Sequence, residues 1–147
     1  MKVSTGPEFF ESVANHPRVL PYVTWKGIYA VDLKDVWKDC VGLEFDTGGW
    51  VFHRLAPDVY EVHTLFLPKS VNVSDKAQEA LAYMFNSGAQ EILTRVPHDL
   101  PHVRRLAEKG GFTFLRRHEI PWQRETGPVE TDVYQLTREA WASQQGR

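Results

Sequence analysis

The sequence predicts an α/β domain with a mixed, mostly antiparallel sheet flanked by about four helices. Two observations predict this class. Amphipathic patterns with a helical period alternate with short apolar runs that are typical of strands. The composition, 42% hydrophobic and 24% charged, is that of an ordinary folded chain. A length of 147 residues suits one hydrophobic core, so we expect a single domain over residues 1–147.

Charge and cysteine content narrow the classes of partner. The net charge is -2 with the two signs interspersed, whereas chains that bind nucleic acid usually carry a basic excess, so we expect no nucleic-acid partner. Cys40 is the only cysteine, which rules out an internal disulfide. No run approaches the roughly 20 apolar residues of a membrane span, and the start shows no signal-peptide pattern. We therefore expect a cytoplasmic protein without a membrane partner.

Helical patterns occupy the N-terminal part of the chain. The apolar residues from Phe9 to Ala14 predict a first helix. It ends before Pro17, because the residue before a proline avoids the α region. A second helix is predicted from Asp32, since residues at i, i+3, i+4 and i+7 make one apolar stripe. The members of this stripe are Leu33, Val36, Trp37 and Cys40.

Three strands are predicted next, separated by turn residues. Residues 41–46 and 50–55 form a predicted hairpin around Thr47-Gly48-Gly49. Residues 59–67, with the sequence VYEVHTLFL, make the longest and most apolar strand. Apolar residues on both of its faces predict a central position in the sheet.

Helices and strands alternate in the remainder of the chain. Asp75 and Gln78 have the spacing of a capping box at the start of a helix, and Asp99 is placed to cap another helix. A polar loop over residues 124–130 separates the last two strands. The elements predicted here are helix 75–87, strand 91–96, a helix after Asp99, and strands 112–120 and 131–137.

Four segments resemble a known family. EVHTLFLP resembles the central strand of the GNAT superfamily of N-acetyltransferases, and AQEALAYMF resembles the helix that follows it. EILTRVPHD resembles the next strand, and VRRLAEKGGF the helix and turn after that. The chain looks most similar to GNAT-like proteins carried by bacteriophages. The resemblance implies an N-acyltransferase that moves an acetyl group from acetyl-CoA to a primary amine on a small molecule or a protein, and it leaves a homodimer open.

The resemblance also implies where acetyl-CoA would bind. In the family the central strand diverges from its neighbour at a bulge, and its free backbone groups pair with the pantetheine arm. Leu65, Phe66 and Leu67 stand at those positions. The following loop and helix start cradle the pyrophosphate through backbone amides. The corresponding residues here are Lys69, Ser70, Val71, Asn72, Val73, Ser74, Asp75 and Lys76.

Three departures from the family pattern support a second interpretation. The loop contains no glycine, and Asp75 either places a negative charge at the helix start or serves as its N-cap. Leu100 stands where the family commonly has an asparagine that contacts the cofactor. Ala107 stands where it commonly has a tyrosine that can protonate the leaving thiolate. The alternative is therefore a non-catalytic structural or interaction protein with the same fold, including one associated with a phage.

Glu61 and His63 are the candidates for catalysis. They lie two apart on the predicted central strand and so point to the same face, where the resemblance implies a base that takes the proton of the attacking amine. A structural network of hydrogen bonds explains the same pair equally simply, and we favour that interpretation. The groove near Trp25 and Trp50 is the expected entry for the acceptor.

For several other residues we prefer a structural role to a functional one. His98 and His102 have the spacing of a metal pair, but the sequence shows no third ligand, so we expect surface histidines and no metal. Cys40 is expected to pack as a small hydrophobic residue. Trp122 and Trp141 follow the last strands and are predicted to be partly exposed, marking a partner surface.

Overall fold

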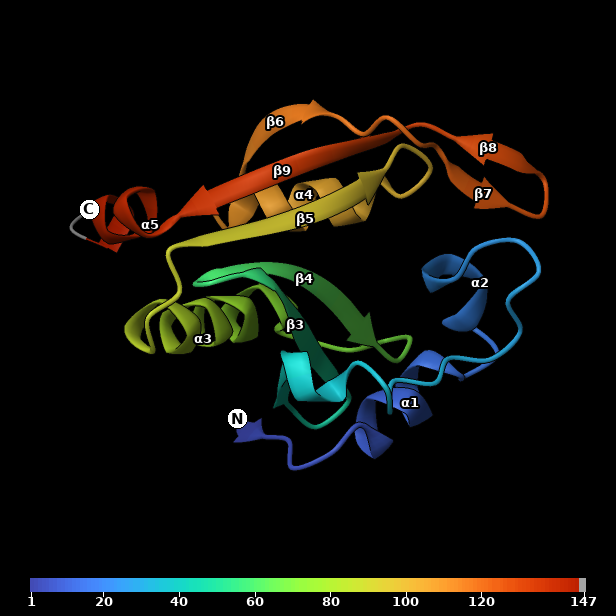
Figure 1. Ribbon diagram of the computed structural model, residues 1–147, viewed down its shortest axis with the longest axis horizontal. Coiled ribbons are helices and arrows are strands. Elements are labelled where there is room, and N and C mark those ends of the chain that lie inside the picture. Colours follow the sequence, from blue (N-terminus) through green and yellow to red (C-terminus); the bar gives the residue numbers. More distant parts are fainter. Residues whose placement is uncertain (146–147) are drawn as a thin grey trace.

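The computed structural model of the chain describes residues 1–145, which form a layered arrangement of helices on a twisted sheet (Figure 1). The elements in chain order are β1 (Lys2–Val3), α1 (Glu8–Ala14), α2 (Leu20–Val23), a short 3-10 turn (Trp37–Asp39), β2 (Cys40–Glu44), β3 (Gly48–Ala56), β4 (Val59–Phe66), α3 (Val73–Asn86), β5 (Glu91–Pro97), α4 (Pro101–Lys109), β6 (Thr113–Arg117), β7 (Trp122–Arg124), β8 (Gly127–Val129), β9 (Thr131–Thr137) and α5 (Arg138–Gln145). Within these residues the helices α1 to α5 outnumber the four that the sequence predicts.

The main sheet is mixed and mostly antiparallel, as predicted. Its strand order within residues 1–145 is β1-β2-β3-β4-β5-β9-β6, and only β4 and β5 run parallel. β4 lies in the middle of the sheet, which confirms its predicted central position, but β3 has nine residues and is one residue longer than β4. A right-handed crossover helix is the usual link between parallel neighbours, and α3 connects β4 to β5 here.

Two hydrophobic clusters hold helices on the sheet. The larger joins β3 and β5 to the inner sides of α3, α4 and α5, with Phe52, Phe85 and Ile92 almost fully buried. The smaller joins α1 to β3 and β4 and contains Phe10, Val51 and Leu65. Because each helix buries only one apolar stripe, burial of these side chains supplies most of the stabilisation of these short helices.

The helix predicted from Asp32 is wrong. Only Trp37–Asp39 forms a 3-10 turn, and Cys40 is instead the first residue of β2, opposite His53. Two side chains of α1 hold the preceding segment: Asn15 Oδ1 accepts from Val31 N at 2.7 Å, and Glu11 Oε2 accepts from Leu33 N at 2.8 Å. Strand pairing and these tertiary hydrogen bonds outweigh the weak local preference for helix.

Two expectations about helix starts are also wrong. Asn72, not Asp75, occupies the N-cap position of α3, and no side chain caps that helix. Leu100 occupies the corresponding position of α4, while Asp99 binds Arg124 through both carboxylate oxygens, at 3.0 and 3.2 Å. A charge-assisted pair to an arginine replaces the expected backbone cap.

The polar loop predicted over residues 124–130 is in fact part of a hairpin. β7 and β8 pair antiparallel, with Trp122 opposite Val129 and Arg124 opposite Gly127. The hairpin extends beyond the main sheet and approaches α2, a short helix that the sequence did not reveal (Figure 1). The sequence analysis also missed β1 and α5. The first turn of α5 is capped by Thr137 Oγ1, which accepts from Ala140 N at 3.2 Å.

Candidate functional site

β4 and β5 separate after a short paired stretch. Their parallel pairing joins residues 59–61 to residues 91–93 and stops there. Beyond it the pair is bridged by Thr94 Oγ1, which donates to Val62 O at 3.4 Å. Within residues 1–145, β4 lacks the expected bulge at this point. The irregularity in the pairing of β3 with β4 lies at Arg54–Ala56 of β3, opposite the first residues of β4. The two central strands therefore form a V-shaped gap.

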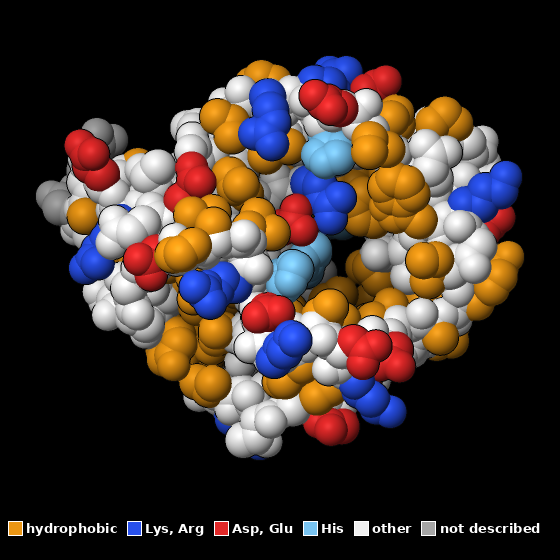
Figure 2. All heavy atoms as spheres, in the orientation of Figure 1, with side chains coloured by type: hydrophobic (Ala, Val, Ile, Leu, Met, Phe, Trp, Pro, Cys, Tyr) orange, Lys and Arg blue, Asp and Glu red, His pale blue; other side chains and the backbone are white. Residues whose placement is uncertain are grey.

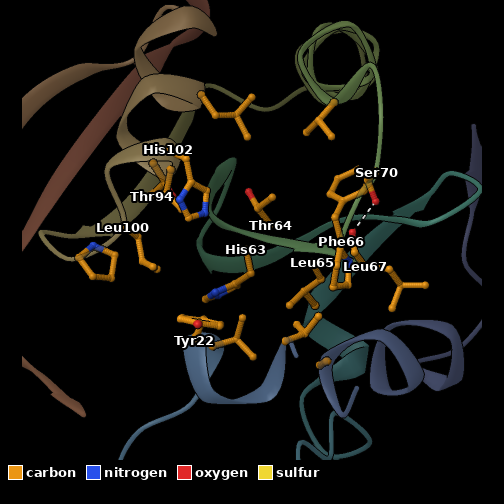
Figure 3. Close-up of a pocket in the computed structure, with 18 of the residues that line it drawn as sticks. Tyr22, His63, Thr64, Leu65, Phe66, Leu67, Ser70, Thr94, Leu100 and His102 are labelled. Carbon is orange, nitrogen blue, oxygen red and sulfur yellow. Dashed lines mark hydrogen bonds between the residues drawn. The ribbon is translucent and has the colours of Figure 1, made fainter. Parts of the chain in front are cut away.

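Backbone groups of β4 face this gap at alternate residues. Leu67 is not among them, because its N–H donates to Thr47 O at 2.9 Å and its carbonyl accepts from Ser70 Oγ at 2.6 Å (Figure 3). Leu65 has the same orientation as Leu67 in the antiparallel pair, and its side chain is buried against α1. The free N–H and C=O groups therefore belong to Thr64 and Phe66.

The gap opens into a cavity of about 1130 Å³. Its walls come from β4, the loop after it, the start of α3, one side of α4, and the segment from Ala14 to Leu33 that includes α2. Figure 3 shows His63 and Thr64 on β4, His102 and Thr94 on a second wall, and Tyr22 on α2. Figure 2 shows the hollow on this face of the molecule, with hydrophobic and histidine side chains around it. The volume is sufficient for a large cofactor and a second small ligand.

The loop after β4 reaches the left-handed conformation without glycine. Lys69 has φ 67° and Asn72 has φ 56°, and asparagine is among the residues that tolerate this region best. The chain thereby enters α3 with no side-chain cap. The amides of Val73, Ser74 and Asp75 precede the first intrahelical donor, Lys76 N, and bind no other group in the described part of the chain.

The structure divides the predicted pyrophosphate residues into two groups. Those that line the cavity are Lys69, Ser70, Val73 and Ser74. Those that do not are Val71, Asn72, Asp75 and Lys76. The ammonium of Lys76 binds Asp46 Oδ1 at 2.8 Å and Val71 O at 2.9 Å, away from the cavity. Uncapped amides at a helix start, with Lys69 beside them, form a site suited to an anion.

Glu61, His63 and Arg95 form a charged cluster at the point where β4 and β5 separate. Arg95 Nη2 donates to Glu61 Oε1 at 3.2 Å, Arg95 Nε lies 2.8 Å from Oε2, and His63 Nε2 lies 3.3 Å from Oε1. Burial raises the pKa of Glu61. The hydrogen bond and charge of His63 and the charge of Arg95 together outweigh burial and lower this pKa to about 2. Glu61 is therefore a fixed anion and a poor proton acceptor near neutral pH.

His63 and His102 are the imidazoles of the cavity. His63 is 40% exposed and lines the cavity, whereas Glu61 lies behind it. His102 is exposed, as predicted, and it also lines the cavity, where it points toward Thr64 in Figure 3. His98 is separate, because its Nε2 lies 2.9 Å from Asp132 Oδ2. Among residues 1–145, no group of three or more His, Cys, Asp or Glu side chains is arranged to hold a metal ion.

Two positions where the family pattern is broken differ in their surroundings. Leu100 lines the cavity and supplies an apolar contact there. Ala107 lies on the side of α4 that is buried in the core and does not line the cavity. His102 lies on the first turn of the same helix as Ala107, and its side chain can both donate and accept a proton. No local pattern signals this placement, because it depends on which side of α4 faces the cavity.

Of the tryptophans singled out from the sequence, Trp122 is partly exposed as predicted, whereas Trp50 and Trp141 lie in the core. Trp50 is 4% exposed in the core, and Trp25 packs on Trp122 with ring centroids 6.2 Å apart. Trp122 does line the cavity; its Nε1 donates to Thr24 O at 2.9 Å, which fixes the hairpin to the end of α2. Trp141 was predicted to be partly exposed, but it is 9% exposed and stacks on Phe85 at 5.2 Å. It marks no partner surface.

Arg124 joins three segments at the edge of the cavity. Its guanidinium is 8% exposed, pairs with Asp99, and donates to the carbonyls of Pro21 and Tyr22 at 3.0 Å each. It also lies over the ring of Trp122, 5.3 Å from the centroid. These contacts hold α2 against the hairpin and the start of α4, so that the wall bearing Tyr22 has a fixed position.

A mixed sheet whose parallel central pair opens into a cavity beside an uncapped helix start is the architecture of the acyl-CoA N-acyltransferase fold. Comparison with solved structures shows that the chain has the fold of GNAT acetyltransferases. Over the part that the structure describes, no helix is long and apolar enough to cross a membrane. The sequence matches no protein-family model and no curated protein.

Three similar structures illustrate the likeness. Spermidine N-acetyltransferase from Vibrio cholerae, in complex with CoA and spermine, has a TM-score of 0.75 at 13% identity over 96% of this chain and 97% of that one. A GNAT-family acetyltransferase from Bacillus anthracis has a TM-score of 0.68 at 17% identity over 93% and 94%. A dodecameric form of the Vibrio cholerae enzyme has a TM-score of 0.63 at 13% identity over 71% and 67%.

Proposed function

We propose that the protein is an N-acyltransferase that moves an acetyl group from acetyl-CoA to a primary amine on a small molecule or a protein. The observation that carries the proposal is the gap between β4 and β5, which exposes unpaired backbone groups to a large cavity. Backbone groups in a buried position are nearly always paired in native proteins. A ligand that adds to this edge as a further strand would satisfy them.

The described residues fit acetyl-CoA along its length. Thr64 and Phe66 offer backbone groups to the amides of the pantetheine arm. The amides at the start of α3 and the ammonium of Lys69 offer positive charge to the pyrophosphate. Arg105 and Lys109, on the cavity side of α4, extend the cationic surface for further phosphate groups.

His63 is the group best placed to take the proton of the attacking amine. Its Nε2 is held by Glu61, which leaves Nδ1 available to the cavity and stabilises the imidazolium that proton transfer creates. Glu61 is then a positioning residue, because Arg95 and His63 keep it ionised. His102 replaces the missing tyrosine of the family pattern as the group that returns a proton to the leaving thiolate.

A non-catalytic scaffold is the second candidate. It is favoured by Leu100 and Ala107, which cannot supply the contacts and the proton that the family pattern provides at those positions. It does not account for the open gap, because a scaffold would gain stability from continued pairing of β4 with β5. The resemblance to phage-encoded proteins and the homodimer stay predictions.

Ser74→Glu tests the proposed cofactor site. It places a carboxylate at the amides of the first turn of α3, where the pyrophosphate would bind. An acidic residue there stabilises the free helix by about 0.3–1 kcal/mol, but it should weaken acetyl-CoA binding at least about 10-fold. Affinity is measured by calorimetry and stability by urea denaturation, so a folding defect cannot be mistaken for the effect.

The matched control is Ser87→Glu, at the exposed far end of the same helix. It should leave the affinity for acetyl-CoA unchanged. Equal affinity of wild type and Ser74→Glu would contradict the proposed site. No binding of acetyl-CoA at millimolar concentration to the wild type would remove the enzymatic proposal and leave the scaffold.

A further inference from the structure

The charged residues that line the cavity all have the same sign. They are Arg18, Lys69, Arg95, Arg105 and Lys109, and none of the Asp or Glu residues in positions 1–145 joins them. Lys69 lies beside the start of α3, and Arg105 and Lys109 lie on the cavity side of α4, where the phosphates of acetyl-CoA are proposed to bind. The remaining part of the cavity therefore lacks any side chain that would pair with a cation.

The wall opposite the gap is mostly apolar, although it includes the cationic Arg18. It consists of the segment between α1 and β2, where Val23, Val31 and Leu33 pack on the smaller hydrophobic cluster and Tyr22 projects from α2 (Figure 3). Trp122 adds a second aromatic side chain from the hairpin. Arg124 donates to the backbone carbonyl of Tyr22, and the Trp122 ring donates to the carbonyl of Thr24. A rigid apolar and aromatic wall favours ligands with hydrophobic bodies.

The carboxylate behind His63 already has cationic partners. Glu61 is 16% exposed and is bound on both oxygens by Arg95 and His63. A second ammonium group of a ligand would have to displace one of these partners, or remain unpaired in a cavity that already holds cations. Either event costs free energy that an uncharged ligand body does not incur.

We propose that the acceptor is an apolar or aromatic primary monoamine, which docks its hydrophobic body on Tyr22 and the wall beside it. This inference rests on the proposed acetyl transfer. The amine nitrogen points toward His63 and loses its proton there. A polyamine such as spermidine, which the similar Vibrio cholerae enzyme acetylates, is then a poor acceptor for this chain. The class of acceptor is set by charge, since both kinds of amine offer the same nucleophile.

Two pairs of amines test the inference, with release of free CoA thiol as the readout. Hexylamine and hexamethylenediamine differ only by a second ammonium group, and phenethylamine is compared with spermidine. We expect kcat/KM for each monoamine to exceed kcat/KM for the paired amine with more than one ammonium group by about 100-fold. Equal or higher kcat/KM for the diamine and spermidine would overturn the inference, as would the absence of turnover with both monoamines.

A charge substitution provides the second arm. Tyr22 is 55% exposed, so Tyr22→Glu leaves the core intact while it adds a carboxylate to the wall. It should lower kcat/KM for phenethylamine and raise that for spermidine, each by about 10-fold. Tyr29→Glu, at a residue 77% exposed and outside the cavity, should change neither. An unchanged ratio of the two amines in Tyr22→Glu would overturn the inference.

Titration with acetyl-CoA distinguishes failure of the proposed function from failure of the proposed acceptor class alone. Wild type, Tyr22→Glu and Tyr29→Glu should bind it with equal affinity, because Tyr22 lies across the cavity from the loop after β4. Loss of binding in the wild type would overturn the proposed function and the acceptor class with it. Normal binding combined with a preference for spermidine would overturn the acceptor class alone.

Discussion

Replacement of Glu61 by Gln should change how stability depends on pH. The pKa of Glu61 is about 2 in the folded protein, against an ordinary value of 4.5. A carboxyl group with a lower pKa in the folded state binds protons more readily when the chain unfolds. Its contribution to stability is therefore complete above pH 4.5 and is lost as the pH falls toward 2.

The magnitude follows from the pKa values. At 1.36 kcal/mol for each pKa unit, the ionised carboxylate contributes about 3 kcal/mol above pH 5, of which about 2 kcal/mol is lost between pH 6 and pH 3. Other carboxyl groups with lowered pKa, such as Asp132, contribute equally to wild type and variant. The difference in free energy of unfolding between wild type and Glu61→Gln isolates the single group.

Urea denaturation followed by tryptophan fluorescence measures this difference at pH 6, 5, 4 and 3. We expect Glu61→Gln to be less stable than wild type at pH 6, by about 2–3 kcal/mol, and the gap to narrow steadily as the pH falls. Glu119→Gln, at an exposed residue with no ion pair in the described part of the chain, should stay within about 0.5 kcal/mol of wild type throughout. A difference that is constant from pH 6 to pH 3 would refute the account of Glu61 as a fixed anion.

Substitutions at three further residues test other parts of the fold. Trp141→Ala removes a buried ring stacked on Phe85 and should cost about 3–5 kcal/mol in urea denaturation; a cost below 1 kcal/mol would contradict its burial. Arg124→Ala should cost roughly 2 kcal/mol and speed amide exchange over residues 20–24, because Asp99 loses its partner. Asn72→Val forces a β-branched residue into a left-handed conformation and should cost about 1–2 kcal/mol, whereas Asn72→Gly should leave stability nearly unchanged. Equal stability of the two Asn72 variants would show that φ at this residue is not constrained.

Local patterns were sufficient for most of the sheet and the longer helices. The hairpin of β2 and β3 and the central strand β4 follow from apolar runs bounded by turn residues. The helix predicted from the apolar stripe between Leu33 and Cys40 does not form, because the period of the stripe fits a helix by coincidence. Side chains of Asn15 and Glu11 bind the backbone at Val31 and Leu33, and Cys40 pairs in β2. A signal for α5 was present, since Thr137 is followed by Arg138 and Glu139, a sequence typical of a helix start.

The site was predictable only where it lies on one strand. Glu61 and His63 share a face of β4, so their contact could be foreseen. Arg95, which fixes the charge of Glu61, is 34 residues away, and Arg124 contacts Pro21 across 103 residues. Pairing of such distant residues depends on strand order and on how α2 meets the hairpin, neither of which has a local signal.

The departures from the family pattern bear on catalysis more than on binding. Binding at the gap and at the start of α3 relies on backbone groups, and Asn72 delivers the required turn without glycine. Leu100 replaces an asparagine that contacts the cofactor in the family pattern, and Ala107 replaces a tyrosine that can protonate the leaving thiolate. A chain that had lost its ligand would be free to extend the pairing of β4 and β5, yet the strands stay apart and leave Thr64 and Phe66 unpaired. The open gap therefore supports the proposal that the protein binds a thioester there, with His63 and His102 as the proposed groups for proton transfer.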